Sequence, residues 1–208
     1  RQMCIRDRVK AVGMELCPAL NISIPVGKDS LSMRTQWNDN GVTKKVTSPV
    51  SLIITGFASI DDVRSTLTPQ LDATEDDTTL VLIDLSRGKM RMGGSILGQV
   101  LNQSGNETPD LDQPKDLIGM VDAVNALRAK GQILAYHDKG DGGLLATVAE
   151  MAFAGHVGVA LNVDMLITEG DGISDSRMDS GEGKNWGNQV SGRREDLTLR
   201  ALFNEELG

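Results

Sequence analysis

The stretch LAYHDKGDGGLLATVAEMAFAG, residues 134–155, contains the residues best suited to chemistry. Its HDKGDGG segment lies between a short apolar run and a helix-like apolar block. The unpaired N–H groups at the start of a helix favour anions, and glycines let a backbone approach a ligand closely. Asp138 follows the predicted strand, where open α/β sheets bind ligands, and a lone carboxylate there suits Mg²⁺ with phosphate oxygens. The pattern therefore indicates a Mg²⁺–nucleotide site.

The same stretch also has a purely structural interpretation. Asp141 could be the N-cap of the following helix, because aspartate is among the best capping residues. Glycines make turns without any ligand, and a single histidine such as His137 is more often hydrogen-bonded and structural than catalytic. The Lys-Ser/Thr pair that follows the glycines of a Walker loop is missing. Both interpretations stay open at this level.

A second candidate is IPVGKDSLSMRT, residues 24–35, in which a glycine precedes Lys-Asp-Ser at the start of a strand. Lys28 and Ser30 could hold a phosphate, with Asp29 on a metal ion or a hydroxyl group. The alternative is a β-turn whose charged side chains are simply solvated.

A third and weaker candidate is RMGGSILGQV, residues 91–100. Gly93 and Gly94 precede a helix that we expect to start near Ser95. They could cradle a phosphate, but close packing of a helix on a strand explains them equally well.

Composition and charge exclude several classes of protein. The 208 residues carry a net charge of −8, which argues against a nucleic-acid surface, and 39% are apolar, as in ordinary globular proteins. We expect no nucleic-acid partner and no membrane partner, because no apolar run approaches the roughly 20 residues of a membrane span. Cys4 and Cys17 lack metal-ligand spacing and a disulfide pattern, so we expect a cytoplasmic protein.

The first part of the chain reads as one helix followed by paired strands. An apolar stripe predicts a helix over 9–16 that Pro18 ends. Period-two alternation predicts a strand over 31–37, and NDNG at 38–41 predicts a hairpin turn. Further strands are expected at 21–26 and 50–60.

Beyond an acidic, turn-rich segment, strands and helices alternate, which indicates an α/β layer architecture. The expected strands are 79–85, 132–136 and 157–163, and the expected helices are 95–101, 117–127 and 144–154. We expect Met151 and Phe153 to lie in the core. The last residues read as a helix followed by a glycine.

Five separated blocks, in order, resemble the large, single-chain phosphoribosylformylglycinamidine synthases of purine biosynthesis. They are VKAVGMELCPALNISIPVGKDSLSM, TSPVSLIITGFASIDDVRSTLTPQL, MGGSILGQV, LLATVAEMAFAGH and ALFNEELG. The resemblance is dense from about Val9 to Leu166 and resumes at Leu197. Residues 1–8 depart from it, and we interpret them as a candidate non-native segment. Residues 168–194 also depart from it, and we interpret them as an inserted loop.

The resemblance implies an α/β fold from the second of two repeats similar to aminoimidazole ribonucleotide synthetase. Residues 1–60 would be the C-terminal part of a strand-rich, barrel-forming PurM-like N-terminal domain. Residues 61–78 would be a linker. Residues 79–208 would form an incomplete PurM-like C-terminal α/β domain with the insertion 168–194.

The resemblance also implies an ATP- and glutamine-dependent amidoligase that converts formylglycinamide ribonucleotide into the amidine. ATP activates the amide oxygen and glutamine-derived ammonia displaces it, so the implied partners are these substrates and the remaining domains of the enzyme. The implied cofactors are Mg²⁺ and ATP or ADP. No catalytic residue of the family matches a position in this chain, so we expect the chain alone to be inactive.

The resemblance assigns binding roles by position. Asp138 matches the Mg²⁺ ligand of the family's HDxSDGG motif, and Gly140 stands where the family has a nucleotide-contacting serine. Lys28, Asp29 and Ser30 match its GKDS block. The implied nucleotide site is auxiliary and structural rather than the reaction centre.

Two other functions stay open. One is a stand-alone ATP-dependent synthetase or kinase of the same superfamily, and the other is a non-catalytic nucleotide-binding scaffold module. The GKDSLSM and FNEELG blocks favour the amidoligase over the stand-alone enzyme.

Overall fold

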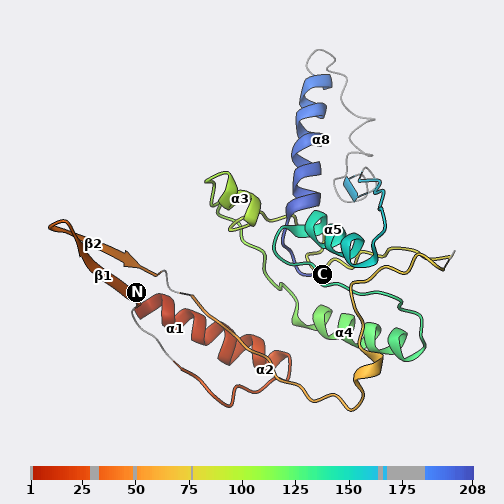
Figure 1. The fold of residues 1–208 in the computed structure, drawn as a ribbon, viewed down its shortest axis with the longest axis horizontal. Coiled ribbons are helices and arrows are strands. Elements are labelled where there is room, and N and C mark those ends of the chain that lie inside the picture. The colour runs from red at the N-terminus through yellow and green to blue at the C-terminus, as the bar shows by residue number, and fades with distance from the viewer. Residues whose placement is uncertain (1, 29–32, 49–50, 76, 164–165, 168–185) are drawn as a thin grey trace. The chain divides into compact units, whose positions relative to one another are not determined.

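The chain forms two compact units, residues 1–63 and 64–208 (Figure 1). The computed structural model describes residues 2–28, 33–48, 51–75, 77–163, 166–167 and 186–208. Helices and one small sheet make up the regular structure of this described part, which is consistent with the α/β class.

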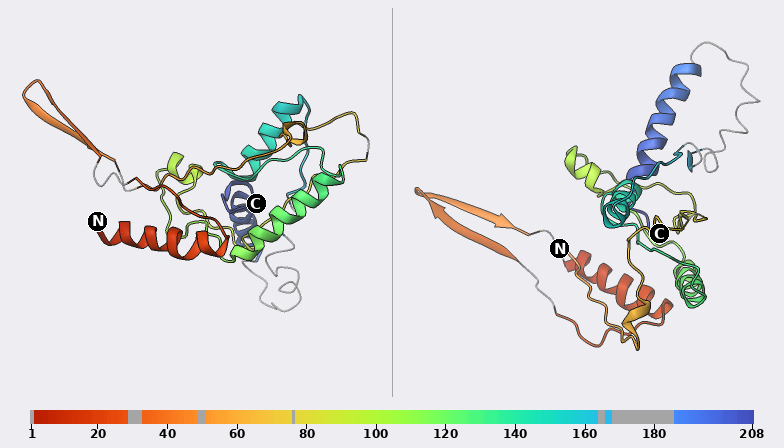
Figure 2. Two further views of the ribbon diagram at one scale, coloured as in Figure 1. Left: turned by 90° about the horizontal axis from the view of Figure 1, so that it is seen from below. Right: turned by 45° about the vertical axis from the view of Figure 1, so that its right-hand side comes forward.

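The first unit contains a β-hairpin whose turn can be predicted from the sequence. β1, Arg34–Asp39, pairs antiparallel with β2, Val42–Thr47, and Figure 2 shows the two strands side by side. Asn40 and Gly41 join them with φ values of 52° and 84°. Two left-handed residues in a two-residue loop are typical of a type I′ turn, which matches the twist of paired strands. The predicted hairpin turn is confirmed.

The N-terminal helix continues past the proline that was expected to end it. α1, Gln2–Lys10, leads into a π-helical segment η1, Ala11–Leu16, and then into α2, Cys17–Ala19. The prediction that Pro18 stops the helix is therefore wrong. The wider π-helical turn places Pro18 at the start of a new helical segment, where a missing N–H is tolerated. The helix ends at Ala19, and Asn21, the residue after the C-cap Leu20, adopts a left-handed φ of 57°.

Five segments predicted as strands carry no strand pairing in the described residues, so these predictions are wrong as stated. The segments are 21–26, 50–60, 79–85, 132–136 and 157–163. A β-strand requires a hydrogen-bonded partner strand. An apolar run predicts burial but does not identify that partner. Two of the five make single long-range backbone bonds: Leu85 N–H donates to the Leu207 carbonyl at 2.9 Å, and Tyr136 N–H donates to Thr68 at 2.9 Å.

Helices dominate the second unit and agree with the predicted periodicity. They are α3 (Ile96–Val100), α4 (Pro114–Ala129), α5 (Gly143–Gly155) and α8 (Trp186–Phe203), and a short 3₁₀ turn η2 (Val63–Ser65) lies at the boundary of the two units. The Ser95 hydroxyl caps α3 by accepting a hydrogen bond from Gly98 N–H at 3.1 Å. Each expected helix of this region is confirmed within a few residues.

The C-terminal region differs from its prediction in two ways. α8 already includes residues 186–194, which were expected to belong to the inserted loop 168–194; the rest of that loop lies outside the described residues. α8 also ends at Phe203, so Asn204–Gly208 is an extended tail and not part of the helix. Asn204 explains the stop, because its side-chain amide donates to the Arg200 carbonyl at 2.6 Å and competes with further helical bonding.

The core of the second unit lies where α5 packs on α8 (Figure 1). The buried apolar side chains are Leu85, Leu144, Val148, Met151, Ile167 and Ala201. Three of these come from one face of α5, spaced three to four residues apart. Phe153 was expected in the core but is 74% exposed, because it lies on the opposite face of α5. No helix in the described residues has the length and apolar character required to span a bilayer.

Candidate functional site

Asp138 presents a free carboxylate in the loop that precedes α5. Its side chain is 82% exposed, and its Oδ1 lies 3.9 Å from His137 Nδ1. The other ring nitrogen of His137, Nε2, lies 2.7 Å from Glu150 Oε2 on α5. His137 is therefore held by a helix side chain, as the structural interpretation expected. Asp138 itself remains open to solvent and to a ligand.

Lys139, the next residue, points the opposite way and is buried. Its Nζ donates to Asn204 Oδ1 at 2.9 Å, and its N–H donates to the Gly208 carbonyl at 2.8 Å. Burial lowers the pKa of Lys139, and the charges of Asp84 and Glu206 offset part of this effect. The burial of Lys139 and the exposure of Asp138 place these neighbouring side chains in different surroundings.

Gly140 leaves room for a ligand. A Cβ placed on it would meet no atom within 4 Å. Among the described residues, its N–H has no hydrogen-bond acceptor. The loop therefore offers the Asp138 carboxylate and the Gly140 N–H two residues apart, with a second exposed carboxylate at Asp141.

The start of α5 is formed by glycines and not by an aspartate cap. Gly142 is the N-cap, with a left-handed φ of 85°, and it makes no side-chain capping bond. The interpretation of Asp141 as the N-cap is therefore wrong. Two consecutive positive φ values, at Gly142 and Gly143, make this bend accessible only to glycine without strain.

The first N–H groups of this bend are already used within the protein. Gly142 N–H donates to Glu205 Oε1 at 2.9 Å, and Gly143 N–H donates to the Gly140 carbonyl at 3.0 Å. These two N–H groups are therefore not available to bind a phosphate, contrary to the expectation for this helix start. A phosphate near this loop would have to be held by other groups.

The GKDS candidate lies in the other unit. Lys28 is exposed and belongs to the first unit, whereas Asp138 and Gly140 belong to the second. Asp29 and Ser30 lie outside the described residues. Their proposed phosphate and metal contacts stay predictions.

The glycine pair before α3 serves close packing. Gly93 N–H donates to the Glu107 carbonyl at 2.6 Å, and Gly94 N–H donates to the Ser104 carbonyl at 2.7 Å. A Cβ on Gly93 would lie 2.5 Å from the Glu107 oxygen, so only glycine fits there. The structure supports close packing, but against the irregular backbone at 104–107 and not between a helix and a strand as expected.

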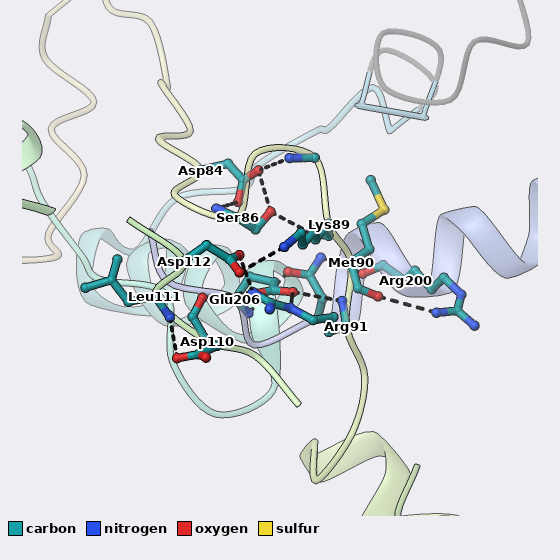
Figure 3. Close-up of polar contacts among 12 residues, drawn as sticks. Asp84, Ser86, Lys89, Met90, Arg91, Asp110, Leu111, Asp112, Arg200 and Glu206 are labelled. Atoms are coloured by element: carbon teal, nitrogen blue, oxygen red, sulfur yellow. Dashed lines mark hydrogen bonds and ion pairs between the residues drawn. The ribbon is translucent and has the colours of Figure 1, made fainter. Parts of the chain in front are cut away.

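A buried ion pair anchors the C-terminal tail beside the loop (Figure 3). Glu206 is fully buried and binds Arg91, which in turn contacts Asp112 at 3.2 Å. The hydrogen bond to Glu206 raises the pKa of Arg91. Asp112 also accepts from Lys89, at 2.9 Å, at the exposed edge of the cluster.

Sequence reasoning missed this cluster and the role of the tail. The available signal was the Asn-Glu-Glu run at 204–206, since the helix dipole disfavours carboxylates directly after a helix, and they are then better stabilised by cations and N–H groups elsewhere. We had assigned this run to the helix itself.

The loop fits a magnesium ion that brings most of its own ligands. Mg²⁺ is commonly bound through one or two carboxylates together with waters and substrate phosphate oxygens. Asp138 supplies one such exposed carboxylate, and the described residues contain no group of three or more His, Cys, Asp or Glu suited to a metal ion. The donor set therefore fits a Mg²⁺–nucleotide complex better than a metal ion enclosed by protein ligands.

Comparison with protein families assigns the two parts of the chain. The family model described as "AIR synthase related protein, C-terminal domain" matches residues 77–204, which is more than half of the chain. The chain belongs to the AIR synthase related family. A second model, described as "FGAR-AT PurM_N-like domain", matches residues 2–59 of this AIR synthase related chain. The two matches support a synthetase superfamily of the purine-biosynthesis type and a ligase or synthetase kind of enzyme.

The candidate residues are divided between these two matches. Asp138 and Gly140 fall within the AIR synthase related region, and Lys28, Asp29 and Ser30 fall within the FGAR-AT PurM_N-like region. The tail residues Glu205 and Glu206 come directly after the first of these regions.

Proposed function

We propose that this AIR synthase related chain is part of an ATP- and glutamine-dependent amidoligase that converts formylglycinamide ribonucleotide into formylglycinamidine ribonucleotide. Within that enzyme it contributes an auxiliary Mg²⁺–nucleotide site. Asp138 would bind the metal, and the Gly140 N–H would bind a phosphate oxygen. The metal would neutralise phosphate charge, and the chain's own residues would orient the nucleotide.

One observation carries the proposal: Asp138 is an exposed carboxylate on a loop that is otherwise fixed to the protein. Its neighbour Lys139 is bonded through both its side chain and its N–H, and Gly142 is bonded to Glu205. A loop anchored at Lys139 and Gly142 that leaves the Asp138 carboxylate exposed and the Gly140 N–H available is suited to a ligand. The family matches support the reaction class.

The GKDS segment, in the other unit, is a separate candidate for phosphate binding in this proposal. Lys28 is exposed, and a lysine ammonium is a flexible point charge suited to phosphate. Asp29 and Ser30 would add a carboxylate and a hydroxyl group. Lys28→Ala should therefore weaken phosphate binding by the first unit, because it removes this positive charge.

Titration of the 208-residue chain with Mg–ADP tests the proposal. Asp138→Asn should weaken binding by about tenfold or more, because an amide lacks the charge that Mg²⁺ requires. Asp141→Asn is the matched control, since it changes the same charge in the same exposed loop. Saturating Mg–ADP should raise the melting temperature of wild type and Asp141→Asn, but not of Asp138→Asn. Equal binding by wild type and both variants would contradict the proposal.

The alternatives give different results in the same experiments. ATP turnover by the purified chain would favour a stand-alone synthetase or kinase. Nucleotide binding without any effect on amidine formation, tested by Asp138→Asn in a complete amidoligase, would favour a scaffold module. We expect no ammonia-dependent amidine formation from the chain alone.

A further inference from the structure

One oxygen atom of the C-terminal tail joins the starts of two helices. Glu205 Oε1 accepts a hydrogen bond from Ile96 N–H at 2.7 Å and another from Gly142 N–H at 2.9 Å. Ile96 is the first residue of α3, and Gly142 is the N-cap of α5. N–H groups at helix starts lack helical acceptors, and a carboxylate satisfies them with charge-assisted bonds.

The tail backbone packs closely against the glycine bend that donates to Glu205. A Cβ on Gly143 would lie 2.6 Å from the Asn204 carbonyl oxygen, so the tail backbone passes directly beside this glycine. Glu205 is partly buried, which reduces competition from water for its bonds. The Glu205 side chain and the tail backbone therefore contact adjacent loop residues, Gly142 and Gly143.

The tail also fixes the other end of the loop. Asn204 and Gly208 bind the side chain and the N–H of Lys139, the residue directly after Asp138. Contacts at Lys139 and at Gly142 thus enclose Gly140 and leave Asp138 exposed. These are tertiary contacts between segments far apart in the chain, so the loop conformation depends on the tail.

We propose that Glu205 is a positioning residue that holds the 138–143 loop in its ligand-ready conformation. The effect of Glu205 on ligand binding rests on the proposed nucleotide function, whereas its hydrogen bonds to the two helix starts do not. Glu205 touches neither metal nor nucleotide: it fixes Gly142, and through it the loop that carries Asp138 and Gly140. Because its carboxylate occupies the Gly142 N–H, phosphate binding is left to Gly140 and the metal.

Hydrogen exchange of individual amides, measured with Mg–ADP titration on the same 208-residue samples, tests the inference. Glu205→Ala should speed exchange at Gly142 and Ile96 by about tenfold and weaken Mg–ADP binding by a similar factor, since a bond to a charged acceptor is lost at each amide. Glu205→Gln keeps an acceptor oxygen of the same reach and should retain most of the protection. Glu195→Ala, an exposed position on α8, is the control and should change neither.

Each outcome decides one question. Unchanged exchange at Gly142 and Ile96 in Glu205→Ala overturns the inference, and so does a loss in Glu205→Gln as large as in Glu205→Ala. If Glu205→Ala fails to fold, Glu205→Gln decides: any faster exchange confined to these two amides supports positioning, and an increase spread equally over the whole chain overturns it. If wild type does not bind Mg–ADP, the proposed function fails, and exchange alone judges the role of Glu205.

Discussion

Glu206 holds Arg91 through three hydrogen bonds in the interior of the second unit. Its Oε1 accepts from the Arg91 N–H at 2.9 Å and from Nε at 2.6 Å, and its Oε2 accepts from Nη2 at 2.8 Å. The Glu206 side chain is completely buried and that of Arg91 is 15% exposed. A bidentate guanidinium–carboxylate pair fixes geometry as well as charge. The tail is therefore bound at a defined register to the segment before α3.

Glu206→Ala should lower the free energy of unfolding by about 3 kcal/mol, because it removes the buried partner of the mostly buried Arg91 guanidinium, which keeps only Asp112 and the Asp110 carbonyl. Urea denaturation measures the change. Arg87→Ala is the control: it breaks the Arg87–Asp116 pair, whose Arg87 side chain is 61% exposed, so the urea midpoint should hardly move. Equal shifts for the two variants would show that burial does not set the strength of these pairs.

Acid should destabilise the protein through Asp112. A hydrogen bond from Lys89, followed by the charge of Arg91, lowers the pKa of Asp112 below its ordinary value of 3.8. At pH values between the folded and unfolded pKa of Asp112, the unfolded state therefore binds more protons than the folded state. The stabilising contribution of Asp112 is complete above the unfolded pKa and is lost as pH falls through the folded one.

Urea midpoints measured between about pH 6 and about pH 3 test this dependence. Asp112→Asn should show a shallower fall of stability below about pH 4 than wild type. Asp122→Asn, an exposed position on α4, should follow the wild-type curve. A variant curve for Asp112→Asn that runs parallel to wild type would contradict the prediction.

The apolar segment 51–60 should make the protein self-associate. Ile53 and Phe57 are 89% and 96% exposed in an extended, unpaired backbone, and such segments pair with other chains. The double change Ile53→Thr, Phe57→Thr should increase the monomer fraction in sedimentation velocity at equal concentration. Val100→Thr removes an isolated exposed apolar side chain and should leave the distribution unchanged. Wild type that sediments as a monomer at every concentration would contradict this expectation.

Local chemistry explains why some elements could be predicted from the sequence. The Asn-Gly turn fixes two left-handed residues between strands, Ser95 caps its own helix, and Gly131 ends α4 with a φ of 67°. Each signal lies within a few residues of its effect. The predictions of the other strands were wrong because strand pairing depends on residues far away in the chain and not on local sequence.

Some features of the candidate site can likewise be predicted from the local sequence, whereas others depend on distant residues. The exposed Asp138 follows from local features: a glycine-rich bend after an apolar run and before a helix. The roles of Glu205 and Glu206 do not follow from local features, because they act on Ile96, Gly142 and Arg91 from the far end of the chain. The sequence predicts a helix through residues 204–207, and this prediction does not identify the side chains that contact the loop.

Gly140→Ser should be tolerated and should strengthen nucleotide binding. A side chain at Gly140 enters open space, and its φ is not in the left-handed region, so the free energy of unfolding should stay within about 0.5 kcal/mol of wild type. The new hydroxyl group would stand beside Asp138 and supply the contact that the family resemblance implies. Mg–ADP affinity should rise by about three- to tenfold, the value of one additional hydrogen bond.

Gly143→Ser is the contrasting change in the same bend. Gly143 has a φ of 69°, and its Cβ would lie 2.6 Å from the Asn204 carbonyl, so the variant should lose more than about 1 kcal/mol of stability. It should also weaken Mg–ADP binding, because displacing the tail releases the loop. Urea denaturation and calorimetric titration of both serine variants provide the test. If Gly140→Ser is the less stable of the two, the loop geometry is incorrect; if it is stable but binds Mg–ADP no better than wild type, the nucleotide does not lie beside Gly140.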